Sequence, residues 1–226
     1  SLTGEIGTVT IPVTTSNYKD INLIVNVKAE NQTHPKVGTV SANAITYGQP
    51  LSASTITGTM QDPNTGATVT GTFTWDTTPA VNPNAGSHDA KWTFTPDESY
   101  GGKYTTYTDT ATVTVNPKAV TVSGITAKDK VYDGKTNATL DCSNAKLNGV
   151  LENDTLTVTA TGTFESANAG EQKVKISGLE LSGASAFNYV PSTENNQTET
   201  TATITARRAT VTRTTSPRYI RKKTPT

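Results

Sequence analysis

Sulfur-containing and imidazole side chains are scarce in this sequence of 226 residues, which has one cysteine, one methionine and two histidines. The single cysteine, Cys142, excludes an internal disulfide framework. Because His34 and His88 are far apart in the chain, a zinc ion would have too few ligands. We therefore expect no metal and no cofactor, and a fold stabilised by strand pairing and core packing alone.

Long apolar runs are also missing from the sequence. No window approaches the roughly 18 apolar residues of a membrane-spanning helix, so we expect no membrane span. The first residues, SLTGEIGTVT, lack the charged and apolar regions of a signal peptide. The chain is therefore expected to begin inside a longer protein or to be processed already.

Arginine is absent from most of the chain. All five arginines, with two lysines and no acid, lie in residues 207–226, which carry +7, while the other 12 lysines face 19 acids. Residues 1–206 thus carry −7, which disfavours nucleic acid as a partner. The basic tail could bind an anionic cell-wall polymer or membrane, be the altered start of another repeat, or be foreign or out-of-frame sequence. The confinement of arginine to the tail favours the last two readings.

Threonine is abundant and makes up about a fifth of the chain. Its β-branched side chain suits a pleated, half-exposed surface better than a helix. With 33% hydrophobic and 6% aromatic residues, the chain can bury two small cores more easily than one large core. The composition therefore predicts an all-β, modular protein.

Several segments of the sequence occur twice, which is typical of repeated modules. TATVTVNPKAV returns as TATITARRATV, NAGSHDAKWTF returns as NAGEQKVKISG, and TGTF occurs in both units. The first copies begin at residues 110, 84 and 70, and the second copies at 201, 168 and 161. ANAITYGQPLSAST from residue 42 opens the first unit as AKDKVYDGKTNATL from residue 127 opens the second. Two related units therefore follow one another.

Alternation of apolar and polar residues predicts strands. In AKWTF the inward-facing set is Ala90, Trp92 and Phe94, and the repeat places Val174 and Ile176 at the first two of these positions. Another predicted strand has Val69, Gly71, Phe73 and Trp75 on its buried face. The preceding QDPNTGAT places proline and glycine where a hairpin turn needs them.

The second unit resembles a known family. The segment from AVTVSGITAKDKVYDG to SGASAFNYV, residues 119–190, resembles the YDG-type repeat of bacterial surface proteins and haemagglutinin-like adhesins, with echoes in YDG (132–134), GTF, NAG and FNY (187–189). The unit before it is similar to the mostly-β modules called MBG. Residues 1–31 look like the final hairpin of a bacterial Ig-like module. The resemblance implies extracellular β-modules of stalks or adhesive arms, and it supplies no catalytic residues.

The resulting division assigns residues 1–32 to the end of an Ig-like module, 33–117 to an MBG-like module, 118–206 to a YDG-type module and 207–226 to the basic tail. Within the YDG motif, Asp133-Gly134 predicts a turn because glycine adopts a positive φ at low cost. Tyr132 can pack its ring at the entry strand of its module. The motif is therefore interpreted as a device of folding and not as a site.

Candidate ligand contacts are three tyrosines in SYGGKYTTYT, namely Tyr100, Tyr104 and Tyr107. Exposed rings beside glycines suit stacking against a sugar, although rings that close the end of a β-sandwich are the favoured alternative. DPNTG from Asp62 partly imitates a calcium loop but lacks the remaining ligands, so a turn is favoured. Adjacent acids in turns and the run Ser87-His88-Asp89 do not form the facing pair or the relay that catalysis requires.

A covalent Lys-Asn or Lys-Asp crosslink is a further alternative, because it replaces disulfides in some bacterial surface modules. It requires a buried lysine, a partner and a carboxylate in an apolar pocket, and the sequence alone does not identify them. Overall, we expect an all-β chain of tandem small modules, of a β-sandwich or β-grasp-like kind, in an elongated array. We expect it to be a monomeric, non-catalytic extracellular segment of a bacterial surface protein that acts as an adhesin stalk or spacer. The alternatives are a module that binds carbohydrate or a host protein, and an inert region of a large surface glycosidase.

Overall fold

The computed structural model describes residues 4–14, 16, 19, 21–29, 32–77 and 82–213. Strands make up more than half of the described residues, and several sheets form, two of which curl into half-barrels. In the described residues the only helical segments are three short 3-10 turns, η1 to η3. The prediction of an all-β protein is therefore confirmed. No helix in this part of the chain is long and apolar enough to cross a membrane.

The chain divides into two compact units, the first comprising residues 1–119 and 185–190 and the second residues 120–184 and 191–226. The first unit begins with a two-stranded antiparallel sheet of β1 (Gly4–Val13) and β2 (Ile21–Ala29). Three aliphatic pairs share one face of this sheet, and all six side chains are 39–63% exposed. These pairs are Val9 with Val25, Ile11 with Leu23, and Val13 with Ile21. The hairpin matches the expectation for residues 1–31, whose assignment to an Ig-like module stays a prediction.

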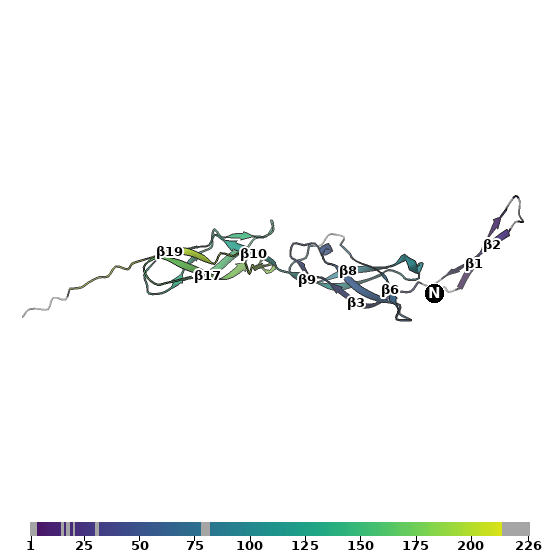
Figure 1. Ribbon diagram of the computed structural model, residues 1–226, viewed down its shortest axis with the longest axis horizontal. Helices are drawn as coiled ribbons and strands as arrows, with labels where there is room; N and C mark the ends of the chain where they lie inside the picture. The colour runs from purple at the N-terminus through teal and green to yellow at the C-terminus, as the bar shows by residue number, and fades with distance from the viewer. Residues whose placement is uncertain are drawn as a thin grey trace, which may run out of the picture. The chain divides into compact units, whose positions relative to one another are not determined.

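The remainder of the first unit contains two sheets, of strand order β3-β5-β6 and β4-β9-β8-β7 (Figure 1). Its elements are β3 (Lys36–Ala42), β4 (Ile45–Thr46), η1 (Leu51–Ala53), β5 (Ile56–Gln61), β6 (Thr68–Val69), β7 (Gly71–Trp75), β8 (Gly86–Pro96), η2 (Glu98–Tyr100) and β9 (Tyr107–Asn116). The two largest fully buried side chains, Trp92 and Phe94, lie on β8, and each is 1% exposed. Their burial confirms the predicted inward-facing set of AKWTF.

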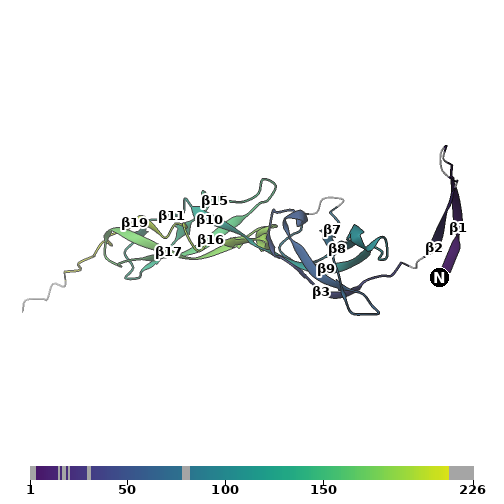
Figure 2. The same cartoon turned by 45° about the vertical axis from the view of Figure 1, so that its right-hand side comes forward.

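The second unit contains a five-stranded sheet of order β12-β19-β17-β16-β13 and two smaller sheets, β15-β10-β18 and β11-β14 (Figure 2). Its elements are β10 (Lys118–Ser123), β11 (Thr126–Ala127), β12 (Lys130–Val131), β13 (Asn137–Ala138), β14 (Leu140–Asp141), β15 (Lys146–Asn148), β16 (Thr157–Phe164), β17 (Gly170–Ser182), η3 (Ala186–Asn188), β18 (Tyr189–Pro191) and β19 (Glu199–Thr205). Val174 is fully buried and Ile176 is 5% exposed, as the repeat predicts.

The two units share one strand arrangement. Gly86 at the start of β8 pairs with Val115 of β9, and Gly170 at the start of β17 pairs with Ile204 of β19. Both glycines have φ of +129°, which side chains with a Cβ rarely adopt. The sequence repeat that begins with NAG is therefore also a repeat of backbone conformation and register.

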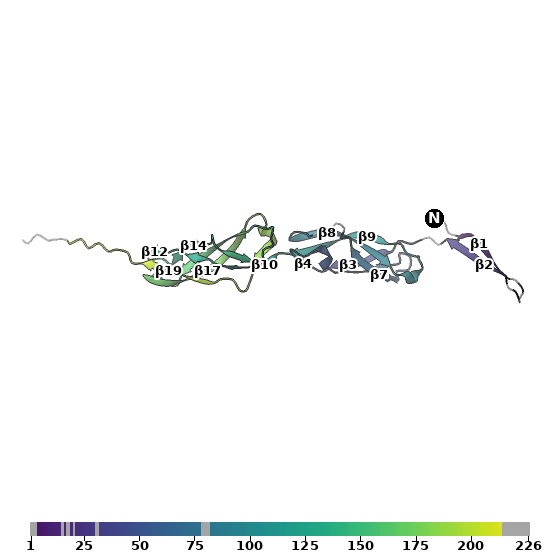
Figure 3. The same cartoon turned by 90° about the horizontal axis from the view of Figure 1, so that it is seen from above.

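Each unit closes by a short parallel pairing. In the first unit Ile45 of β4 pairs with Val115, and in the second Lys130 of β12 pairs with Ile204, as Figure 3 shows for β12 beside β19. Just past these ladders, Tyr47 donates its N–H to the carbonyl of Asn116 and Tyr132 donates to that of Thr205, both at 2.9 Å. The tyrosines of the two opening motifs therefore occupy matching positions.

The TGTF repeat is not a repeat of register. Phe73 of the first TGTF pairs with Phe94, whereas Phe164 of the second pairs with Val174. Val174 is the counterpart of Ala90 and not of Phe94, so the two copies lie four residues apart relative to the neighbouring strand. Four is an even number, so both phenylalanines still point into a core. The two TGTF copies therefore share the alternation of side chains toward the core, but they pair with different positions of the neighbouring strand.

Candidate functional site

A buried polar cluster in the first unit surrounds Asp62, whose side chain is 4% exposed. The predicted hairpin turn positions it, since Asp62 and Ala67 close the turn between β5 and β6. One carboxylate oxygen accepts the backbone N–H groups of Asn64 and Thr65 at 2.8 and 3.0 Å. The other oxygen accepts the hydroxyl of Tyr104 at 2.7 Å. The turn interpretation of DPNTG is confirmed, and its acid is held by groups of the fold.

Lys103 completes this cluster with an Nζ–Oδ2 distance of 3.3 Å to Asp62. The hydroxyl of Tyr104, the two turn N–H groups and Lys103 lower the pKa of Asp62 well below its usual range. Hydrogen bonds to Tyr104 and Asp62 raise the pKa of Lys103. Amide formation requires a neutral amine and an uncharged carboxyl, and these shifts favour the charged forms of both. The pair is suited to be an ion pair and not a crosslink.

The three tyrosines proposed as ligand contacts have different environments. Tyr104 is 8% exposed, and the ring of Tyr100 lies edge-on to it with centroids 5.0 Å apart. The Tyr100 hydroxyl accepts the N–H of Thr70 at 3.0 Å, and hydrogen bonds from Thr70 lower the pKa of Tyr100. The ring of Tyr107 packs beside that of Trp92 at 5.8 Å. All three rings therefore have packing roles, and a role in ligand binding stays a prediction.

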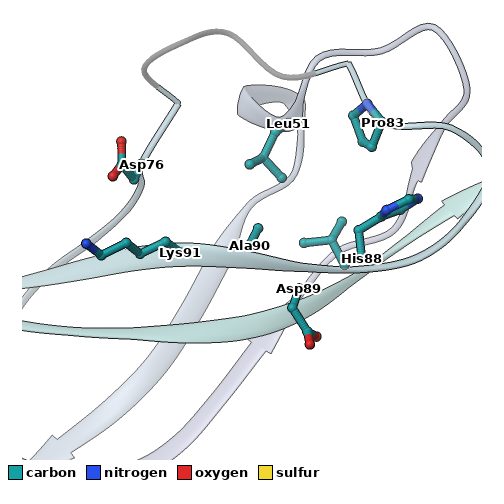
Figure 4. A pocket seen from close by; sticks show the side chains of 8 residues that line it. Leu51, Asp76, Pro83, His88, Asp89, Ala90 and Lys91 are labelled. Carbon is teal, nitrogen blue, oxygen red and sulfur yellow. The ribbon is translucent and has the colours of Figure 1, made fainter.

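A pocket of about 260 Å³ lies beside β8 (Figure 4). Its apolar lining includes Leu51, Ala90 and Val113, and its polar lining includes His88 and Lys91. The Nε2 atom of His88 lies 2.7 Å from the carbonyl oxygen of Asn84, so this nitrogen carries the proton. The pocket can hold a small apolar group under a polar rim.

The run Ser87-His88-Asp89 does not form a relay at this pocket. The side chain of Asp89 points away from that of His88 in Figure 4, and its carboxylate accepts the hydroxyl of Thr112 at 2.7 Å. In a strand, adjacent side chains point to opposite faces, so the two neighbours cannot exchange a proton directly. The expectation drawn from the sequence agrees with this geometry.

The YDG motif of the second unit is a turn held by its own charges. Lys130 forms a 2.8 Å ion pair with Asp133 and donates to the carbonyl of Lys135 at 3.0 Å. Asp133 also accepts the N–H of Lys135 at 2.9 Å, and Gly134 has φ of +77°. The hydrogen bonds from Lys130 and Lys135 lower the pKa of Asp133. The carboxylate therefore folds the turn that the sequence predicts.

The thiol of Cys142 is partly buried against the core of the second unit. Burial, together with the charge of Asp141, raises its pKa. A thiol with a raised pKa is a weaker nucleophile at neutral pH because less thiolate is present. Within the described part of the chain, no group of three or more His, Cys, Asp or Glu side chains could hold a metal ion.

Comparison with known proteins identifies part of the chain. A family model described as the YDG domain matches residues 116–197. Residues 116–197 are a YDG domain. No curated protein and no solved structure matches the chain. The match covers just over a third of the sequence and contains the Tyr132-Asp133-Gly134 turn, so the resemblance read from this motif is confirmed for the YDG domain. The MBG-like assignment of the preceding unit and the adhesin context stay predictions.

The contacts of Asn188 were missed by sequence reasoning. Its side chain is 2% exposed and bonds the bend at Asn84-Ala85-Gly86, called the NAG turn below, in the first unit, to which residues 185–190 also belong. The partners lie 103 and 104 positions apart in the sequence. The repeated NAG and the FNY segment were both visible in the sequence, but nothing local in either segment indicates that they meet.

Proposed function

We propose that the chain is a non-catalytic, load-bearing spacer of a bacterial surface protein, located outside the cell. The observation that carries this proposal is the parallel closure found in both units, β4 with β9 and β12 with β19. The resemblance of the YDG domain to repeats of surface proteins supports the location. The tandem order of two similar units supports a spacer, because each added module lengthens an array.

Parallel closure matters because of how force enters a unit. When the two ends of the chain are pulled apart, parallel strands near the two ends slide along each other. The hydrogen bonds between them are then loaded together in shear, whereas an antiparallel hairpin pulled at its open end loses its bonds one after another. The arrangement therefore resists tension along the chain.

Further contacts strengthen the closure of each unit. In the first, Thr33 forms a parallel bridge with Tyr104, donating to the carbonyl of Lys103 at 2.8 Å. In the second, the N–H of Gln197 donates to the carbonyl of Val122 at 2.8 Å, and its side-chain amide bonds both backbone groups of Ile125. In each unit, hydrogen bonds thus join an early segment of the chain to a late one.

The two units repeat their backbone more closely than their side-chain chemistry. His88 at the pocket is matched by Gln172, and both side chains bond the carbonyl four residues earlier, at Asn84 and Asn168. Trp92 is matched by Ile176, and both are buried. The two units thus share a side-chain contact that shapes the turn and a filled core, whereas the side chain at the pocket differs between them. This favours a spacer over a ligand site that is repeated in each unit.

Single-molecule pulling tests the proposal. Stretching the whole chain by its ends should give two main unfolding events, one for residues 33–117 and one for 118–206. Each releases close to 90 residues, or roughly 300 Å of extended chain. Unfolding of both units at the low force of a peeled hairpin would contradict a load-bearing role.

The alternative, a module that binds carbohydrate or a host protein, rests on Tyr100, Tyr104 and Tyr107. A glycan array probed with the chain and with its Tyr107→Ser variant tests it. Tyr104→Ala is a poor control because this ring is buried and bonded to Asp62. Binding that the Tyr107 variant loses while remaining folded would favour the binding module.

A further inference from the structure

In the first unit, an Asn-Tyr pair occupies the end at which β4 meets the NAG turn. The side-chain oxygen of Asn188 accepts the N–H of Ala85 at 2.7 Å, and its nitrogen donates to the side-chain oxygen of Asn84 at 3.2 Å. The ring of Tyr189 lies edge-on to that of Tyr47, with centroids 5.4 Å apart at 80°. Asn188 is 2% and Tyr189 6% exposed, so the pair is seated in a fitted site.

The groups that contact Asn188 and Tyr189 in the first unit have counterparts at matching positions in the second unit. Because Gly86 pairs with Val115 as Gly170 pairs with Ile204, Asn84 and Ala85 correspond to Asn168 and Ala169. Tyr47 corresponds to Tyr132 because both follow the parallel ladder and donate to the last carbonyl of the partner strand. An asparagine, a turn N–H and a tyrosine ring are therefore present in the same arrangement.

These groups are open in the second unit. Tyr132 is 42% exposed and Val131 beside it 59%, and Asn168 and Ala169 are also exposed. In the first unit, Tyr47 and Ala85 are partly buried, whereas Asn84, like its counterpart Asn168, is exposed. Within the described ranges, the second unit has no hydrogen bond to the Asn168 side chain or to the Ala169 N–H that would replace those of Asn188.

We propose that Tyr132, Asn168 and Ala169 form a docking site for residues 185–190 of a second copy of the YDG domain. The asparagine of that copy accepts the N–H of Ala169 and donates to Asn168, and its tyrosine packs edge-on against Tyr132. The occupant is identified by the first unit, where the same segment fills the same site. This assignment goes beyond the spacer function and would also apply to a binding module.

The sequence after β19 supports a YDG copy as the occupant. RRATVTR at residues 207–213 follows β19 as KAVTVSG at residues 118–124 follows β9. In the strand register, where Ile204 matches Val115, Val211 corresponds to Val122 of β10, which is fully buried, yet Val211 is 89% exposed. The repeat of TATVTVNPKAV counted by sequence alone matches Val211 with Val120 instead, and Val120 is also buried. A segment similar to the one that joins β9 to the YDG domain therefore follows β19.

Amide hydrogen exchange on an extended chain tests the proposal. A copy of residues 118–206 is inserted between Ala206 and Arg207 of the full chain. In the unextended chain, the Ala85 amide should exchange at least tenfold more slowly than that of Ala169. In the extended chain, Ala169 should slow by at least tenfold, and Asn188→Ala within the inserted copy alone should abolish this slowing without changing Ala85. Equal exchange of Ala169 with and without the inserted copy would overturn the proposal.

A second measurement is independent of how the inserted copy folds. The peptide GASAFNYVPS, residues 183–192, is titrated to millimolar concentration into the unextended chain and followed by NMR. We expect shift changes at Ala169 and Tyr132, and none with the peptide in which alanine replaces the asparagine. Absence of any change at these residues with the first peptide, or equal changes with both peptides, would also overturn the proposal.

Discussion

Replacing Trp92 by phenylalanine should cost the first unit less stability than replacing Trp75, although Trp92 is the more deeply buried. The indole N–H of Trp92 is buried and has no hydrogen-bond partner among the described residues, while that of Trp75 donates to the carbonyl of Ser54 at 2.8 Å. A buried donor without a partner costs about 1–3 kcal/mol, and phenylalanine removes it. The smaller ring loses roughly 1–1.5 kcal/mol of burial.

The two effects nearly cancel at Trp92, so Trp92→Phe should change the free energy of unfolding by less than about 1 kcal/mol. At Trp75 they add, because the lost ring area is joined by a carbonyl of Ser54 that loses its donor, and Ser54 is itself 3% exposed. Trp75→Phe should therefore cost about 2–3 kcal/mol. Trp92→Ala should cost about 3–5 kcal/mol, which checks that the site is a packed core.

Urea unfolding followed by tryptophan fluorescence suits this comparison. The protein has two tryptophans, Trp75 and Trp92, and both lie in the first unit, so each phenylalanine variant keeps one probe of that unit. A loss at Trp92→Phe that equals or exceeds the loss at Trp75→Phe would refute the reasoning. It would mean that the indole N–H of Trp92 is satisfied in solution.

Three further predictions concern acid stability, backbone strain and thiol reactivity. The fold lowers the pKa of Asp62, so its ionised form stabilises the first unit at pH values above the unfolded pKa of about 3.9, and this stabilisation is lost as the pH falls below that value. The urea midpoint of the first unit should therefore fall at acid pH. The fall should be less steep in Tyr104→Phe, which lacks the hydroxyl that donates to Asp62. Gly170→Ala should lower the calorimetric melting temperature of the second unit at a cost of about 1–3 kcal/mol, since its φ is +129°; an unchanged melting temperature would contradict the strain. Cys142 should react with a thiol reagent at pH 7.5 more slowly than a small free thiol, because burial and Asp141 raise its pKa.

The sequence predicts which side chains of a strand face the core better than it predicts which residues of neighbouring strands pair. Alternation identified Trp92 and Phe94 as core, and the repeat correctly placed Val174 and Ile176 there, because the facing of a strand is set by its own period of two. The register of the two TGTF copies could not be read in this way. Pairing depends on the loop between strands, which is longer after Trp75 than after Phe164.

The parallel pairings of β4 with β9 and of β12 with β19, and the contacts of Asn188, join residues that are distant in the sequence. β4 and β12 are two residues long, too short for a periodic signal, and their parallel partners lie about 70 residues further along the chain. The sequence makes Tyr104 a candidate for an exposed ring beside glycines, yet the ring is buried, and its hydroxyl donates to Asp62 on a distant turn. A local pattern carries no information about such partners, so these features required the structure.

The direction of pulling tests the central claim most directly. Handles on the two chain ends load both parallel closures in shear, whereas handles at cysteines replacing Ser87 and Thr114, a cross-strand pair at the open end of the antiparallel β8–β9 hairpin, peel that hairpin. Both replaced side chains are exposed, and Cys142→Ala removes the competing thiol. We predict a several-fold higher unfolding force for the first unit when the ends are pulled. Equal forces in the two directions would show that parallel closure bears no load.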